Sequence, residues 1–373
     1  MAKATRKKKK ISAPKNQAMD GLCDGFEPLQ SLDLKKVKNF DDLAKAMSMT
    51  SFGGRRLGEA VDVLYEMVKD PDCFVVGTFS GAMTTAKMGL LMCDMIDSGM
   101  LNAVVSTGAL MTHGMIEGFG MTHFKYKLGL MKDEDLRKRG YDRIYDTLEL
   151  EKNLDDLEEI VSEVFSKMDS KEIMCSYKIT EAIGAYLNKV SRGRGILKSA
   201  HLKKIPVYIP AFTDSEVGLD FGLHNRQQKL KGQEALRYDP FIDLEHFTNL
   251  ISRQKTTGIF TVGGGVPRNW AQQVGPYIDL VTWRIKYNSD PKHYFKPDGS
   301  NHGQPYKYAV RICPEPVELG GLSGCTYSEG VSWGKFVPPE KGGVTAEVLA
   351  DATIAWPIIL KAVMERMKKN KKK

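Results

Sequence analysis

The chain has 373 residues, of which 42% are apolar and 27% are charged; this composition is typical of a globular protein and excludes disorder of the whole chain. The net charge of +8 is concentrated at the two ends, because residues 1–16 contain seven Lys or Arg, residues 366–373 contain six, and neither segment contains an acid. Without these thirteen charges the body carries about −5. Such a body suits a cationic substrate better than a nucleic acid, which is not expected as a partner.

The same charge distribution suggests how the chain is divided. We expect a disordered basic tail at residues 1–16, a single large domain at 17–365 and a basic C-terminal tail at 366–373. The six cysteines form no CxxC pair, so neither a metal site nor a disulfide framework is expected, and a reducing cytoplasm is the natural compartment. No segment approaches about 18 uninterrupted apolar residues, so membrane spanning is not expected.

Short apolar runs that alternate with helical spacing indicate an α/β protein. We predict strands at 73–80, 101–109, 205–212, 257–265 and 278–285, and helices at about 82–98, 151–169 and 171–192. A last helix is predicted to begin at Thr345 as its N-cap and to be interrupted near Pro357. Continuous Val/Ile runs of this kind favour a Rossmann-like fold, with a mainly parallel sheet covered by helices on both faces.

Small polar residues and glycines follow four of the predicted strands, in "GTFSGAMTT", "STGALMTH", "PAFTDSE" and "VGGGVPRN". Ligands of open parallel sheets bind beyond the carboxyl ends of the strands, where these segments would meet. Neither a GxGxxG nor a Walker A motif is present, so a standard Rossmann fingerprint is excluded. The set still suits a dinucleotide bound through backbone N–H groups and small side chains.

The segment "YSEGVSWGKF" surrounds Lys335 with unusual neighbours. Trp333 offers a ring face that attracts cations, Glu329 supplies a carboxylate, and Gly330 and Gly334 permit close approach of the backbone to a ligand. In a desolvated site the pKa of a lysine falls and the amine becomes a nucleophile that can form a Schiff base. The alternative is an ordinary solvated surface lysine.

"SEGVSWGKF", together with "TVGGGVPRN", "PAFTDSEVG" and "LADAT", resembles the deoxyhypusine synthase family, which also includes homospermidine synthases, over roughly residues 35–365. The resemblance implies an NAD-dependent aminobutyl transferase with a Rossmann-like fold, usually a homotetramer with active sites at subunit interfaces. In such enzymes NAD takes a hydride from a polyamine donor, spermidine or putrescine. The imine passes to the motif lysine, an acceptor amine collects the butylamine group, and the new imine is reduced.

The resemblance also implies roles for individual residues. Lys335 would carry the covalent imine, Glu329 would accept a proton or anchor an amine, and Trp333 would line the donor pocket. The residues that match the cofactor site are Ser80, Thr84, Thr107, Asp214, Gly264, Gly265 and Asp351. The alternatives are that Asp214 and Asp351 cap helices and that Trp333 is a core residue.

Three positions in the amine pocket depart from the family pattern. Asn269 stands where the family has a histidine, and an amide can orient an amine but cannot take its proton at neutral pH. Leu322 and Leu219 stand at or beside positions of two polyamine-anchoring acids. The charge that the leucines lack would come from Asp220, or from one of two nearby glutamates, Glu315 and Glu318; alternatively, the donor is shorter.

Two further departures concern other parts of the chain. His113 stands where the family's cofactor loop usually has an acid. Residues 286–307 look like an insertion that would form either a lid or a surface loop.

The function that these observations favour is transfer of an aminobutyl group to free putrescine, which forms homospermidine. One alternative is deoxyhypusine synthesis, in which the acceptor is a lysine of a translation initiation factor. A second alternative is a catalytically silent protein that binds NAD or a polyamine, although such a protein has no need of an imine-forming lysine.

Overall fold

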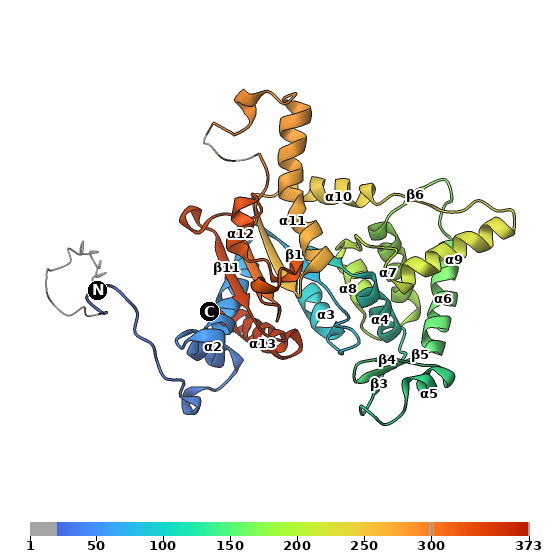
Figure 1. The fold of residues 1–373 in the computed structure, drawn as a ribbon, viewed down its shortest axis with the longest axis horizontal. Coiled ribbons are helices and arrows are strands. Elements are labelled where there is room, and N and C mark those ends of the chain that lie inside the picture. The colour runs from blue at the N-terminus through green and yellow to red at the C-terminus, as the bar shows by residue number, and fades with distance from the viewer. Residues whose placement is uncertain (1–20, 298–299, 301, 372–373) are drawn as a thin grey trace.

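A six-stranded parallel sheet forms the centre of the computed structural model, which describes residues 21–297, 300 and 302–371 (Figure 1). The expected tail at residues 1–16 lies outside these described residues. The strand order is β11-β10-β9-β1-β2-β7. The strands are β1 (Cys73–Phe79), β2 (Ala103–Ser106), β7 (Val207–Tyr208), β9 (Thr256–Val262), β10 (Tyr308–Ile312) and β11 (Val344–Val348).

Successive residues of the central strands point to opposite faces of the sheet, and both faces are apolar. Phe79 and Phe260 lie in one buried cluster, whereas Val76 and Ile259 lie in another. Two apolar faces require a helical layer on each side, so the predicted α/β fold with a parallel sheet between helices is confirmed. Helices on the first face include α1 (Phe40–Ser48), α2 (Phe52–Lys69), α3 (Gly89–Asp97) and α13 (Ala352–Lys371), and on the second face α10 (Phe241–Ser252) and α11 (Gly265–Leu280).

Six further helices of the described chain, with two small sheets, extend the body on the right of Figure 1. The first apolar cluster continues into this region without a break, because Phe165 and Phe221 belong to it. The elements there are α4 (Gly108–Gly118), α5 (Asp133–Lys138), α6 (Glu151–Ser166), α7 (Ser176–Val190), α8 (Ile196–Lys203) and α9 (Glu216–Leu230), with a small sheet of β3 (Phe124–Lys125), β5 (Thr147–Leu150) and β4 (Tyr141–Ile144) and a strand pair of β6 (Ile173–Met174) and β8 (Arg237–Tyr238). Among the described residues no helix is long and apolar enough to cross a membrane.

The structure corrects two predicted elements. Residues 278–285 are not a strand, since α11 runs to Leu280 and a π-helical turn continues to Lys286. A short run of Val, Ile and Trp has no period that separates the two possibilities. Thr345 begins no helix, because residues 344–348 pair with β10 as strand β11, and α13 starts at Ala352 and continues through Pro357.

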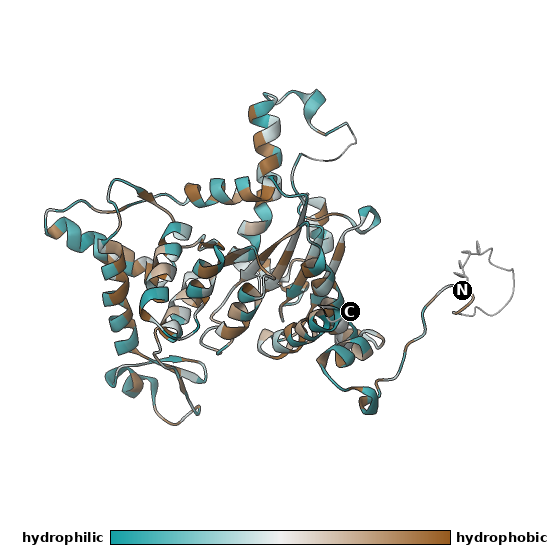
Figure 2. Ribbon diagram, turned by 180° about the vertical axis from the view of Figure 1, so that it is seen from behind, coloured by the Kyte–Doolittle hydropathy of each residue, from teal (hydrophilic) through white to brown (hydrophobic). Residues whose placement is uncertain are grey.

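The described residues that follow α11, 286–297, protrude from the body at the top of Figure 1, whereas Tyr306, near the end of the expected insertion at 286–307, is buried in the core. Within the protruding segment Tyr287 stacks on His293, and Trp283 of the preceding helical turn contacts Tyr294 edge-on. Apolar colouring continues along α11 out of the body in Figure 2, where Leu280 and Ile285 are exposed. This segment lines neither of the pockets described below.

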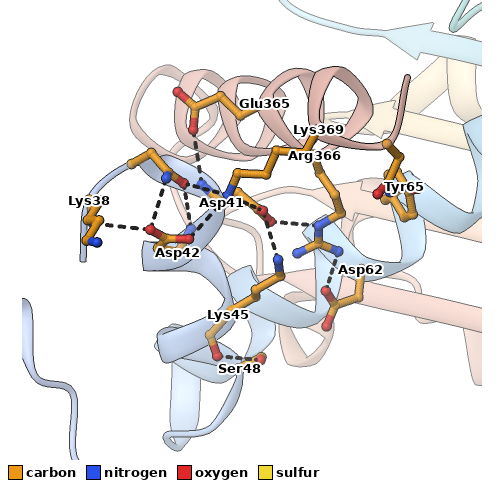
Figure 3. A network of polar contacts seen from close by, with 12 residues as sticks. Lys38, Asp41, Asp42, Lys45, Ser48, Asp62, Tyr65, Glu365, Arg366 and Lys369 are labelled. Atoms are coloured by element: carbon orange, nitrogen blue, oxygen red, sulfur yellow. Dashed lines mark hydrogen bonds and ion pairs between the residues drawn. The ribbon is translucent and has the colours of Figure 1, made fainter. Parts of the chain in front are cut away.

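The C-terminal helix is fastened to the start of the domain by buried charges (Figure 3). Helix α13 continues to Lys371 and so includes most of the segment 366–373 that we expected to be a basic tail. The folded part therefore extends past residue 365. Arg366 Nε donates to Asp41 Oδ1 over 2.7 Å, and Lys45 and Lys369 also contact the carboxylate. Burial alone would raise the pKa of Asp41, but the hydrogen bonds from these three cations lower it to about 2.

We predict that Asp41→Asn costs about 3 kcal/mol of the free energy of unfolding at pH 7, because it removes the buried one of the two carboxylates that pair with Arg366. The matched control is Asp62→Asn, which removes the half-exposed second partner of the same arginine and should cost less than about 1 kcal/mol. Urea unfolding measures both. Since the folded pKa of Asp41 lies below its ordinary value of 3.8, the cost should shrink as the pH falls towards 2. Equal costs for the two variants at pH 7 would contradict the prediction.

Candidate active site

A cavity of about 300 Å³ lies at the carboxyl ends of β1, β2, β7 and β9. This is the point at which the sheet order changes direction, since the chain passes from β1 outward to β2 and β7 and then returns to β9 on the other side of β1. The lining residues are Ser80, Gly81, Ser106, Thr107, Gly108, Ala211, Asp214, Gly265, Val266, Pro267 and Ser323. The structure thus brings four of the predicted cofactor residues, Ser80, Thr107, Asp214 and Gly265, to one cavity.

Two helices begin at this cavity. Gly108 and Gly265 are the first residues of α4 and α11, and both line it. Aligned peptide dipoles give such ends a positive character that favours an anionic group. Gly265 has a φ of +60°, which a side chain rarely adopts, and a Cβ at Gly264 would lie 2.5 Å from the Cα of Ser323. Glycine is therefore favoured at both positions, at Gly265 by the backbone conformation and at Gly264 by the close approach of the loop at Ser323.

Hydrogen bonds fix the loops that form the cavity walls. Ser80 Oγ accepts from the N–H of Gly264 over 2.8 Å and so joins the ends of β1 and β9. Thr107 caps α4 and donates to the carbonyl of Gly81 over 2.9 Å. Thr84 is buried behind the wall, where its hydroxyl donates to the carbonyl of Leu110, so it does not line the cavity.

The two aspartates of the predicted cofactor set differ in what their carboxylates contact. Asp214 lines the cavity, is exposed and makes no hydrogen bond through its side chain within the described part of the chain. Asp351 lies outside the cavity at the start of α13, where its Oδ1 accepts from the backbone N–H and the hydroxyl of Thr353. Asp351 therefore caps a helix, whereas the carboxylate of Asp214 is open to a ligand.

A second cavity, of about 290 Å³, contains Lys335 and shares two walls with the first. On α11, residues 265–267 line the first cavity and residues 268–269 line the second; in the same way Ser323 lines the first and Leu322 the second. The second cavity is lined by Arg268, Asn269, Gln272, Gln273, Leu322, Cys325, Thr326, Glu329, Gly330, Trp333 and Lys335. A ligand that extends through the first cavity would therefore reach the lysine.

The lysine motif is held in place by α12 (Tyr327–Ser332) and by the turn that follows it. Thr326 caps this helix through the N–H of Glu329, and Gly334 adopts a φ of +68° that turns the chain away from the helix axis. The carbonyl of Lys335 then accepts from the N–H of Tyr306 over 2.9 Å. The side chain of Lys335 is consequently presented from a fixed backbone.

The Lys335 amine is half-buried among polar and aromatic groups. Its Nζ donates to Asn269 Oδ1 over 3.1 Å and lies 5.9 Å from the centre of the Trp333 ring. Burial lowers the pKa of Lys335, and the positive charge of Arg268 lowers it further, against smaller opposing effects of Cys325 and Glu329. Trp333 is 65% exposed, so it is not a core residue but an open wall of the cavity. The amine is therefore biased towards its neutral, nucleophilic form.

Sequence reasoning missed the two arginines that shape both cavities. Arg268 donates to the carbonyls of Ser323 and Cys325, and Arg311 donates to the same two carbonyls from β10. Arg311 also pairs with Glu347, which accepts from the N–H of Tyr327 at the start of α12. The sequence offered one signal for Arg268, which is its position just after the glycine run at a strand end. No local pattern distinguishes Arg311 from any other strand arginine.

Asp220 and Glu318, which we expected to replace the family's amine-anchoring acids, lie outside the cavity that contains Lys335. Glu318 is exposed on a short 3₁₀ turn, and Asp220 lies on α9; neither lines the lysine cavity. Burial raises the pKa of Asp220 to about 7, with further contributions from Glu158 and Glu216. Within the described residues, Glu329 is the one carboxylate that lines the lysine cavity.

Comparison with known proteins identifies the family to which the chain belongs. The family model described as deoxyhypusine synthase matches residues 42–363. "Probable deoxyhypusine synthase 1" of Methanosarcina acetivorans is 33% identical over 92% of this chain and 96% of its own, and "Probable deoxyhypusine synthase 2" of Archaeoglobus fulgidus is 32% identical over 84% and 94%.

A third relative and a solved structure extend the comparison. A "Deoxyhypusine synthase-like protein" of Elusimicrobium minutum is 28% identical over 89% of this chain and 82% of its own. A crystal structure from Entamoeba histolytica assigned to a deoxyhypusine synthase shares the fold, with a TM-score of 0.56 at 15% identity over 90% of this chain and 97% of that one. The chain therefore belongs to the deoxyhypusine synthase family of aminobutyl transferases.

Proposed function

We propose that this protein is an NAD-dependent transferase that moves the butylamine group of spermidine or putrescine through Lys335 to free putrescine, which forms homospermidine. The observation that carries the proposal is the Lys335 amine, half-buried and with a lowered pKa, in a cavity that shares its walls with the strand-end cavity. The cytoplasm remains the proposed compartment.

The strand-end cavity has the chemistry that NAD requires. The N-termini of α4 and α11 suit its pyrophosphate, and the free carboxylate of Asp214 suits the two hydroxyls of a ribose. Ser80, Thr107, Gly264 and Gly265 would hold the cofactor mainly through the backbone that they position. Bound NAD would supply the redox chemistry, by accepting a hydride from the donor amine and returning it at the end of the reaction.

Lys335 would act on the imine that donor oxidation produces. Its neutral amine attacks the imine carbon, the bond from that carbon to the donor nitrogen breaks, and the leaving amine is 1,3-diaminopropane from spermidine or ammonia from putrescine. The acceptor amine then attacks the lysine imine in the same way and releases Lys335. Each exchange needs an unprotonated amine, which the partial burial and the neighbouring charge of Arg268 favour.

Glu329 is the group we assign to proton transfer. Asn269 already accepts a hydrogen bond from Lys335, and its amide cannot take up a proton. Glu329 is the carboxylate that lines the cavity among the described residues, and the cap at Thr326 fixes the start of its helix. Trp333 would lie against the aliphatic part of the donor.

A second copy of the chain would complete the amine pocket. Asp220 and Glu318 lie outside the lysine cavity, and the exposed Leu219 and Leu223 on α9 offer an apolar surface beside Asp220. We therefore propose a homotetramer in which acids of one subunit reach the cavity of another.

The alternative acceptor is a lysine of a hypusine-type translation factor. The names of the relatives favour this alternative, since both are called probable deoxyhypusine synthases. Asn269 and Leu322 line the lysine cavity at positions where the family has a histidine base and an amine-anchoring acid. Because both groups are replaced, we favour free putrescine as the acceptor.

We predict that reductive methylation of Lys335 reaches half its maximal rate at a lower pH than methylation of exposed lysines, because burial disfavours the charged amine. Glu329→Gln should shift this midpoint further down, since the carboxylate favours the ammonium. Glu66→Gln on α2 is the surface control and should leave the midpoint unchanged. Mass spectrometry of the Lys335 peptide gives the rate, and a midpoint equal to that of the exposed lysines would refute the assignment.

We predict that borohydride reduction in the presence of NAD and spermidine adds a butylamine mass at Lys335, and that Lys335→Ala loses both the adduct and all transfer while NAD still binds. The surface variant Lys341→Ala should behave like the natural chain. An intact Lys335 that gains no mass would identify a silent binding protein.

The products decide between the two acceptors. Free homospermidine formed from putrescine without any protein acceptor supports the proposed reaction. A butylamine adduct on an added hypusine-type factor, with no free polyamine product, would replace it with deoxyhypusine synthesis.

A further inference from the structure

Three buried side chains outside both cavities converge on one point. His113 lies on α4, His123 directly precedes β3, and Glu149 lies on β5. Their potential ligand atoms all lie within 4.8 Å of one another. The His123 Nε2 atom is 2.5 Å from Glu149 Oε2, and His113 Nδ1 is 3.4 Å from both of these atoms. The side chains of His123 and Glu149 are 1% exposed and that of His113 is 9% exposed.

The triangle formed by these three atoms has the size of one face of a metal coordination shell. Atoms separated by 2.5 to 3.4 Å can all lie about 2.1 Å from a single ion, the distance at which Zn²⁺ binds imidazole nitrogen and carboxylate oxygen. Without an ion, Glu149 Oε2 can accept from both rings through its two lone pairs, or His113 Nδ1 can accept from His123 Nε2. The same three atoms could each direct one lone pair to a cation in place of these hydrogen bonds.

The carboxylate is also oriented as a ligand would be. Glu149 Oε1 accepts from Asn153 Nδ2 over 2.6 Å and from the N–H of Leu150 over 3.0 Å. These bonds occupy one oxygen and turn the other, Oε2, towards the two rings. Hydrogen bonds of this kind fix the orientation of metal-binding carboxylates in proteins.

Lys87 is the group that competes with an ion. Its Nζ lies 3.0 Å from His123 Nδ1, so the ammonium donates there and places the ring proton on Nε2, which then donates to Glu149. A metal would need the Nε2 lone pair, so that proton would have to leave. The lysine has a second partner within reach, because Glu117 Oε1 is 3.7 Å from Nζ. A shift of Lys87 to Glu117 would free His123 for the metal.

We propose that His113, His123 and Glu149 form a site for a divalent transition metal, Zn²⁺, and that Lys87 weakens the binding of that ion. Two imidazoles and one carboxylate are a ligand set that Zn²⁺ accepts, with a coordination position left over. The ion would fasten the small β3-β5-β4 sheet to α4. Since α4 begins at the wall of the strand-end cavity, this metal site would stiffen that wall from behind.

The test is Zn²⁺ binding to the full-length, untagged protein after treatment with a chelator, measured by competition with a chromophoric chelator. The natural chain should bind one Zn²⁺ per chain. Glu149→Gln and His123→Ala should each weaken binding at least tenfold. His201→Ala is the matched control, because it removes a partly exposed histidine that pairs with Glu181 outside the proposed site, and it should leave the affinity unchanged.

Lys87→Met gives a result that a purely structural cluster would not give. It removes the competing donor from a half-exposed position, so the protein should stay folded and bind Zn²⁺ several-fold more tightly. Zn²⁺ should raise the thermal midpoint of the natural chain and of Lys87→Met, but not that of Glu149→Gln. Absence of stoichiometric binding by both the natural chain and Lys87→Met, or an affinity that Glu149→Gln leaves unchanged, overturns the proposal.

Discussion

Both cavities depend on two buried guanidinium groups that hold one loop. Arg268 of α11 and Arg311 of β10 donate to the carbonyls of Ser323 and Cys325, which belong to the loop between the two cavities. Burying two cations is costly unless their hydrogen bonds are satisfied, and the ion pair of Arg311 with Glu347 supplies part of the compensation. The loop that separates the two cavities is thus held by two buried arginines, of which Arg268 also lines the lysine cavity.

The arrangement of the sheet explains why the two cavities lie side by side. All six strands of the central sheet are parallel, so their carboxyl ends and the loops that follow them meet at one edge. Helix α11 leaves this edge after β9, and its first turn faces the strand-end cavity while the next residues face Lys335. One helix, α11, therefore sets the relative position of the strand-end cavity and the cavity that contains Lys335.

Buried charged groups have opposite effects at Asp41 and at Lys335. At Asp41, cations from α1 and α13 stabilise a buried carboxylate, and the helix that carries the last basic residues becomes part of the fold. At Lys335, burial and a neighbouring arginine destabilise a cation and leave a more nucleophilic amine. The ion pairs of Asp41 stabilise the fold, whereas the partial burial of the Lys335 amine costs some stability and lowers its pKa.

The sequence by itself determined the fold class, the family and the residues on the strand-end loops, because strand runs, glycines and the motif around Lys335 are local patterns. Only the tertiary structure decided that residues 278–285 continue a helix and that residues 344–348 form a strand, since pairing with β10 selects the conformation there. It alone placed Thr84 behind the wall and Asp220 away from Lys335. It also brought Arg311 to Ser323 and His113 to Glu149, because such contacts join segments whose separation along the chain leaves no local signal.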